Sequence, residues 1–192
     1  SETRTYDGTV NSSGAVGISG LYGSDSVTGA TQSFASRHVM GANASTLQVN
    51  AGYTVNDGNG GNNYTLTTNT AAGTITPASL TVSTTSVNRV YDTTQNAAGS
   101  AIVTGGVLYV TDTISGGTFQ FASKNAGTNV TVNVSGVTVN DDNAGNNYAV
   151  TYAANNTSNI AQASLNVTGV TANSRVYDGT TVAGLGGAAT VT

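Results

Sequence analysis

One short phrase recurs in this chain at a long and nearly constant interval, which limits what the chain can fold into. The pattern Arg-x-Tyr-Asp surrounds Tyr6, Tyr91 and Tyr177, at intervals of 85 and 86 residues. A stretch of this length can bury a hydrophobic core of its own without disulfides or metals. The spacing therefore predicts tandem copies of one small domain.

Other landmarks recur in the same order between the copies of this phrase. Their offsets drift by two or three residues, which places insertions in the intervening loops, where chains tolerate them. The pairs are LYGSDSV (21–27) and LYVTDTI (108–114), FASR (34–37) and FASK (121–124), YTVNDGNGGNNYTL (53–66) and VTVNDDNAGNNYAV (137–150), and ASLTV (78–82) and ASLNV (163–167).

Apolar and polar residues alternate along each copy, as they do in strands that bury one face. STLQVNAGYTV (45–55) and VTVNVSGVTV (130–139) show this pattern, the second with a phase shift at Gly136. Thr and Val, which favour strands, are abundant, whereas the residues that favour helices are scarce. With roughly six to eight short strands per copy, the sequence predicts an all-β fold of tandem β-sandwich-like (bacterial Ig-like) repeats of about 85 residues.

Charge and composition exclude several classes of partner. The net charge is −4 and only 5 residues are Lys or Arg, so no basic patch is available for nucleic acid or an anionic membrane surface. No apolar run reaches the roughly 18 residues of a membrane span, and we expect no membrane insertion. The chain has no Cys, which excludes disulfides and thiolate metal sites. Because the chain begins with a phrase that recurs later, we expect it to be a piece of a longer protein.

The recurring phrase has two interpretations, and we favour the structural one. In the structural interpretation, the Tyr ring is buried where copies meet, the Asp accepts hydrogen bonds from backbone N–H groups in a turn, and the Arg shields a sheet edge. In the alternative, each copy displays a ligand contact. The residues of this structural repeat motif are Arg4, Tyr6, Asp7, Arg89, Tyr91, Asp92, Arg175, Tyr177 and Asp178.

Two Asn- and Gly-rich loops are weak candidates for calcium binding. NDGNGGNN (56–63) offers Asp57, and NDDNAGNN (140–147) offers Asp141 and Asp142. A calcium loop normally supplies several carboxylates and a terminal bidentate acid. These loops offer only one or two carboxylates, and neither has the terminal acid. We therefore favour hairpin loops that tolerate positive φ, and expect no cofactor.

The sequence contains few side chains that could serve as a catalytic nucleophile, acid or base. The sole histidine, His38, aligns with Asn125 in the next copy, so a triad built on it could occur only once in a repeated scaffold. The one acidic pair, Asp141 and Asp142, is adjacent in sequence, and its side chains diverge in an extended chain. We expect that the chain is not an enzyme.

The landmarks together resemble the YDG-type repeat of filamentous-haemagglutinin-like bacterial surface adhesins of two-partner secretion systems. The residues that carry the resemblance are RVYDGTT (175–181), FASKNAGTNVTV (121–132), VNDDNAGNNYAV (139–150) and GTITPASLTV (73–82). One departure is Thr93, which stands where Gly8 and Gly179 follow the Asp. The resemblance implies a secreted module at the cell surface, used in a stalk or fibre, and it supplies no catalytic residue.

In such repeats the strand ASLTV opens a unit and TITP closes the one before. This frame gives residues 1–77 as a repeat lacking its opening strand, 78–162 as a complete repeat, and 163–192 as the start of a third. A sheet that lacks a strand has an open edge that favours pairing. We expect the edge to be completed by the tail of a neighbouring chain or by a preceding repeat.

These observations predict a structural stalk or fibre segment whose partners are neighbouring repeats or copies of itself. Tandem repeats make rods of defined length, and abundant Thr, Ser and Asn keep their surfaces soluble. The alternative is a carbohydrate- or matrix-binding module with host or matrix glycans as partners. Tyr53 and Tyr152 are its candidate contact residues, because neither has a Tyr counterpart in the other copy.

Overall fold

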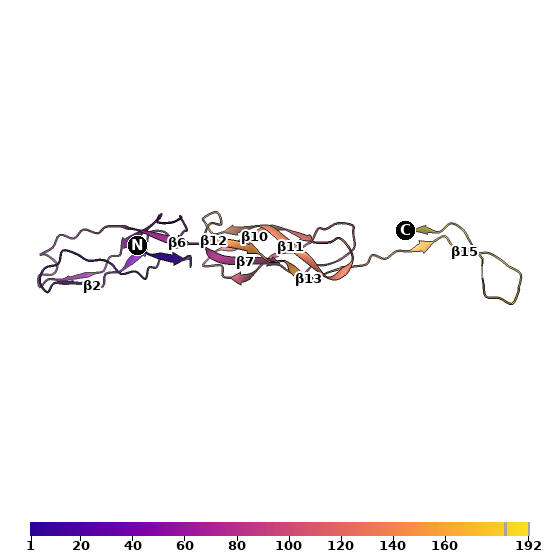
Figure 1. Ribbon diagram of the computed structural model, residues 1–192, viewed down its shortest axis with the longest axis horizontal. Helices are drawn as coiled ribbons and strands as arrows, with labels where there is room; N and C mark the ends of the chain where they lie inside the picture. The colour runs from indigo at the N-terminus through magenta and orange to yellow at the C-terminus, as the bar shows by residue number, and fades with distance from the viewer. Residues whose placement is uncertain (183, 192) are drawn as a thin grey trace.

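The computed structural model describes residues 1–182 and 184–191 and has an elongated shape, with two β units and a thin tail arranged end to end (Figure 1). We refer to residues 1–77 as the first unit, 78–162 as the second unit and 163–192 as the tail. The regular elements of the described ranges are strands, and the predicted all-β, sandwich-like fold is confirmed. In those ranges, no helix has the length and apolar character needed to cross a membrane.

The second unit contains two sheets. One has the order β10-β11-β13-β8, and the other has the order β12-β7-β9. In the second sheet, β7 is central, because it pairs in parallel with β12 and antiparallel with β9. The strands are β7 (Ala78–Thr84), β8 (Asn88–Val90), β9 (Ala101–Gly106), β10 (Thr113–Phe121), β11 (Gly127–Asn140), β12 (Tyr148–Tyr152) and β13 (Asn155–Ala161).

The first unit reproduces only one of these sheets. Its order β1-β6-β4-β3 corresponds to β8, β13, β11 and β10 of the second unit, and the ribbon β2-β5 corresponds to the remaining halves of β10 and β11. Residues 15–20 and 64–69, which align with β9 and β12, form no strand. The strands are β1 (Thr3–Thr5), β2 (Ser26–Thr28), β3 (Gln32–Phe34), β4 (Ser45–Val49), β5 (Thr54–Asn56) and β6 (Ala71–Thr76).

One hydrophobic core runs through the boundary between the units. Phe34, Leu47 and Ile75 of the first unit belong to the same buried cluster as Leu80 and Val82 of β7. A second cluster closes the far end of the second unit, and its members are Val87, Phe121, Val132 and Ile160. Pro77 alone separates β6 from β7. The two units therefore share packing and are not joined by a flexible linker.

The tail forms two short ribbons away from both cores. β14 (Val167–Thr168) pairs with β17 (Thr190–Val191), and β15 (Thr171–Ala172) pairs with β16 (Leu185–Gly186). Residues 163–169 are exposed throughout, although their alternation matches that of β7. The strand that is central to the second unit thus has an unpacked counterpart in the tail.

Candidate interaction site: the junction between units

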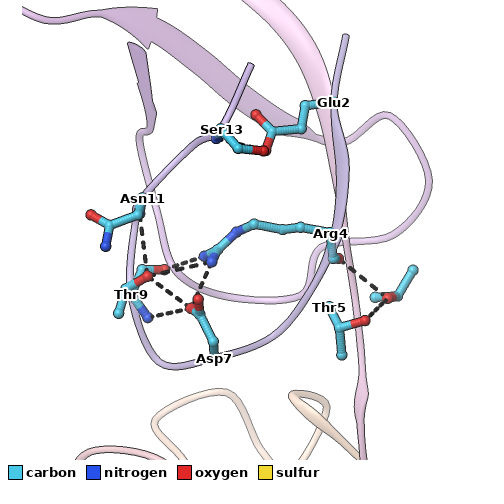
Figure 2. A network of polar contacts seen from close by, with 8 residues as sticks. Glu2, Arg4, Thr5, Asp7, Thr9, Asn11 and Ser13 are labelled. Carbon is cyan, nitrogen blue, oxygen red and sulfur yellow. Dashed lines mark hydrogen bonds and ion pairs between the residues drawn. The ribbon is translucent and has the colours of Figure 1, made fainter. Parts of the chain in front are cut away.

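The Arg-x-Tyr-Asp phrase folds into a compact loop at the end of the first unit (Figure 2). The Arg4 guanidinium donates to Asp7 Oδ1 at 2.6 Å and to the Thr9 carbonyl. The same Asp7 oxygen accepts from the Thr9 N–H and hydroxyl, both at 2.8 Å. Partial burial opposes ionisation, but these hydrogen bonds outweigh it and lower the pKa of the Asp7 carboxyl. The ionised Asp therefore closes the turn.

The loop forms in the same way in the other two copies. Arg89 donates to Asp92, and Arg175 donates to Asp178 at 2.8 Å. The third copy lies in the tail, where Tyr177 is 91% exposed, so the loop forms without a neighbouring unit. Thr93 adopts a φ of 71°, close to the 77° of Gly8, and thus takes the left-handed turn despite its β-branched side chain.

Each guanidinium in the two units also covers an aromatic ring of its own core. The Arg4 Cζ lies 5.0 Å from the centre of the Phe34 ring, and the Arg89 Cζ lies 4.9 Å from that of Phe121. This distance is within the range of a cation–π contact. The Arg thus fixes the loop to the end of the sandwich, and this arrangement leaves the Tyr free to reach the next unit.

Tyr6 joins the two units. Its ring is 1% exposed and packs edge-on against Tyr109 and Tyr148 of the second unit, at centroid distances of 5.8 and 5.4 Å. Its hydroxyl donates to Asp112 Oδ2 at 2.8 Å, and the Tyr148 hydroxyl donates to the same oxygen at 2.7 Å. A hydrogen bond to a charged group contributes about 1.5 to 3 kcal/mol. Asp112 is therefore the polar centre of the junction.

Burial and the Asp112 carboxylate together raise the pKa of Tyr6 to about 12. Both factors act on the phenolate: burial removes its hydration, and the nearby negative charge repels it. Burial likewise raises the pKa of Tyr148. Both hydroxyls consequently stay protonated at neutral pH and remain donors to Asp112.

A second contact lies beside the tyrosines, between the FASRHV segment of the first unit and the NDDNAGNN loop of the second. Asn147 Oδ1 accepts from the Val39 N–H at 2.9 Å, and Asn143 Nδ2 donates to the Val39 carbonyl at 3.0 Å. His38 Nδ1 lies 3.2 Å from Asn147 Nδ2. The ion pair of Arg37 with Asp142 adds little, because Asp142 is 80% exposed. This contact thus depends mainly on a fully buried Asn that holds the backbone of the neighbouring unit.

The calcium candidates have other partners in this structure. Asp141 accepts from the N–H groups of Asn143, Gly145 and Asn147 at 2.7 to 2.9 Å. Asp57 accepts from the N–H groups of residues 59, 61 and 63 in the same way. Both carboxylates have a lowered pKa, Asp57 through these hydrogen bonds and Asp141 through them against the opposing effect of burial. Over the described part of the chain, no three His, Cys, Asp or Glu side chains gather as metal ligands.

The two candidate glycan tyrosines differ in their surroundings. Tyr152 is 43% exposed, and its hydroxyl accepts from the Val137 N–H at 3.0 Å. Tyr53 lines a groove of about 250 Å³ in the first unit, together with Val16, Ile18 and Leu66. Tyr53 therefore belongs to the first unit and Tyr152 to β12 of the second, and the two rings have different surroundings.

At its opposite end, the first unit has an Asp–Tyr pair like that of Asp112 and Tyr148, and no other unit in the described part of the chain covers this pair. The Tyr64 hydroxyl donates to Asp25 Oδ2 at 2.6 Å and accepts from the Tyr22 N–H, as Tyr148 does with Asp112 and Tyr109. The hydrogen bond to Asp25 raises the pKa of Tyr64. Tyr22 is 79% exposed. Each unit thus has a donor end with the Arg-x-Tyr-Asp loop and an acceptor end with the Asp–Tyr pair.

Sequence reasoning did not identify Asp112 as the partner of Tyr6. The two residues are 106 positions apart, so no local pattern connects them. The available signal was the recurrence of Asp25 and Asp112 at the same place in the LYGSD and LYVTD landmarks. An acid that recurs in a chain with so few charges indicates a role in every copy.

The fold and the junction define a tandem array of sandwich-like β units that dock end to end. The chain belongs to the YDG domain family, which it matches in two copies, over residues 1–71 and 76–157. No curated protein and no solved structure matches it.

Proposed function

We propose that this chain is a structural segment of a stalk or fibre in a secreted bacterial surface adhesin of the haemagglutinin-like, two-partner secretion type. The observation that carries the proposal is the junction, in which Tyr6 of one unit is buried against Asp112 and Tyr148 of the next. A continuous core and a one-residue connection at Pro77 support a stiff rod, because little freedom remains between the units. Such a rod is suited to holding a binding domain away from the cell.

The rod is tested by small-angle X-ray scattering of the chain. We expect a maximum dimension that equals the end-to-end length of the structure and stays constant with temperature below unfolding. Insertion of a Gly-Ser linker between Thr76 and Pro77 is the matched control, and it should broaden the distance distribution. If the unmodified chain already gives the broad distribution, the units are not a rigid rod.

The location is tested separately, by immunogold electron microscopy of the source cells with antibodies raised against this chain. Gold particles outside the cell envelope are the expected result. Particles confined to the cell interior would contradict a role in a surface stalk.

A further inference from the structure

The two units carry different versions of the surfaces that meet at a junction. After the Asp of the Arg-x-Tyr-Asp loop, the first unit has Gly8 and the second unit has Thr93. At the acceptor end, Gly23 of the first unit is equivalent to Val110 of the second, within the LYGSD and LYVTD landmarks. We call the two loops the Gly loop and the Thr loop, and the two acceptor ends the Gly acceptor and the Val acceptor.

The junction within the chain joins the Gly loop to the Val acceptor and leaves no room for a side chain at Gly8. A Cβ atom there would lie 2.5 Å from Val110 Cγ2 and 3.0 Å from the Tyr109 Cβ. Carbon atoms that are not bonded to each other pack at about 3.5 to 4.0 Å. The Gly loop therefore fits this acceptor because it lacks a side chain.

Val110 is an unfavourable residue for its own unit. It has a φ of 53°, which a β-branched residue rarely adopts, whereas Gly23 takes the same turn without strain, at 58°. The Val110 side chain is also 67% exposed, so it adds little to the core of the second unit. A strained residue that contributes little to the packing of its own unit points to a role at the surface that it presents.

The Thr loop has the same backbone conformation as the Gly loop, so the two differ in the side chain. Thr93 has a φ of 71° and Gly8 has a φ of 77°. In both loops the Arg donates to the Asp carboxylate, which also accepts from the N–H group two positions after the Asp. A Thr loop docked in the same way would therefore place a Cβ atom, a methyl group and a hydroxyl against Val110.

The main polar contacts of the junction are available to both kinds of unit. Tyr91 repeats the hydroxyl of Tyr6. Lys124 repeats the positive charge of Arg37. Val39 contributes its backbone to the Asn contact, and every residue other than proline offers the same groups. These contacts hold a unit in place without distinguishing one kind of unit from the other.

We propose that Gly8 and Val110 determine which units can dock to each other. The Val acceptor takes a Gly loop and rejects a Thr loop, whereas a Gly acceptor takes either. Such selectivity arises from an unfavourable contact with the wrong partner rather than from a better contact with the right one. Because the Thr loop and the Val acceptor occur in the same unit, two units of this kind cannot dock to each other in succession. The proposal goes beyond the stalk function, since it applies to any array of these units.

The test uses four versions of this chain: the unmodified chain, Gly8→Thr, Val110→Gly and the double variant. Together they present each kind of loop to each kind of acceptor within the same junction. Hydrogen exchange of the Val39 N–H measures docking, because this group donates across the junction to Asn147 Oδ1. We expect exchange to be roughly tenfold faster in Gly8→Thr, from overpacking, and close to the unmodified rate in the other two variants.

Backbone strain of Thr at position 8 is present in both the docked and the undocked loop, so it does not affect this comparison. Exchange of the Leu80 N–H, in the central strand, is the reference for global unfolding. Val107→Gly is the matched control for Val110→Gly, because it removes another exposed Val before β10, and it should not rescue Gly8→Thr.

If Gly8→Thr does not fold, Gly8→Ala takes its place, since it adds the Cβ atom alone. The proposal is overturned if the substitution at Gly8 leaves exchange unchanged, or if it accelerates exchange equally with and without Val110→Gly. Neither result would affect the proposed stalk function, which is tested by the scattering and labelling experiments.

Discussion

The two units have nearly the same sequence pattern, but only the second has both sheets of a sandwich. Residues 15–20 and 64–69 of the first unit alternate much as β9 and β12 do, yet they form no ladder. The difference is β7, whose backbone pairs with β9 and β12 simultaneously. These segments therefore become strands only when a central strand supplies their hydrogen-bond partners.

The largest effect is expected from Leu80→Ala, which weakens the central strand that distinguishes the second unit. Leu80 is fully buried, so the change should lower the free energy of unfolding by about 2 to 5 kcal/mol. Denaturant unfolding measures this loss, and hydrogen exchange should show β9 and β12 losing protection first. Leu66→Ala in the first unit is the control, and we expect a loss below about 1 kcal/mol at that half-exposed position. Equal losses would show that the first unit is packed as tightly as the second.

Gly8→Thr should have the second-largest effect on stability. It gives the first unit the residue that the second unit has at the equivalent position, Thr93. The new Cβ would lie 2.5 Å from Val110 Cγ2 and 3.0 Å from the Tyr109 Cβ. We expect a destabilisation of about 1 to 3 kcal/mol from overpacking. Thermal unfolding measures it, and Gly179→Thr in the tail is the control with the same turn and no neighbour. A loss no greater than in the control would indicate that only the backbone turn matters.

Tyr148→Phe and Tyr64→Phe compare the Asp–Tyr pair that is buried at the junction with the equivalent pair at the exposed end of the first unit. Removal of the buried Tyr148 hydroxyl should cost about 1 to 2 kcal/mol, because one donor to the Asp112 carboxylate is lost and the Tyr109 N–H loses its acceptor. At Tyr64, where water replaces the hydroxyl, we expect less than about 0.5 kcal/mol. Chemical denaturation measures both. A larger effect at Tyr64 would contradict the assignment of the uncovered end.

Alkaline pH should weaken the junction through Tyr6. The pKa of Tyr6 is about 12 in the folded chain, above its ordinary value of 10.0, so the unfolded chain releases this proton first. The stabilisation is complete below pH 10 and is lost as pH rises toward 12. Unfolding midpoints measured across this interval should fall less steeply in Tyr6→Phe than in the unmodified chain. An identical slope would show that folding does not raise the pKa of Tyr6.

The smallest effect is expected from Thr93→Gly. Thr93 has a φ of 71°, where a β-branched residue is strained and glycine is not. Relief of this strain is opposed by the greater freedom of glycine in the unfolded chain, so a net gain of at most about 1 kcal/mol is expected. Thr94→Gly is the control, and it should destabilise, because the Thr94 hydroxyl and N–H both donate to Asp92.

Much of the fold could be predicted from the sequence, because strand alternation is local. Val132, Val134, Val137 and Val139 are all buried, and the predicted phase shift occurs at Gly136, which has a φ of 64°. The first unit is less regular: β4 ends at Val49, and Ala51 is exposed although its parity matches that of Leu47. The alternation of residues in this segment could not reveal that strand pairing ends at Val49.

The candidate site was only partly predictable for a related reason. The turn chemistry of Asp7 is local and follows from its neighbours, whereas the Tyr6–Asp112 pair joins two units. Val110, with a φ of 53°, could not be anticipated, because β-branched residues rarely adopt that conformation. Its side chain packs closely against Gly8 of the neighbouring unit. Contacts between repeats thus depend on residues that a pattern within one repeat cannot connect.

The parallel pairing of strands has a mechanical consequence. In the second unit, the chain enters through β7, which pairs in parallel with β12, and it leaves through β13, which pairs in parallel with β8. Tension along the rod would therefore slide these strands past one another, loading all the hydrogen bonds of a ladder together. Antiparallel hairpins pulled from their open ends instead separate one bond at a time. A unit connected in this way should resist stretching until an entire ladder breaks.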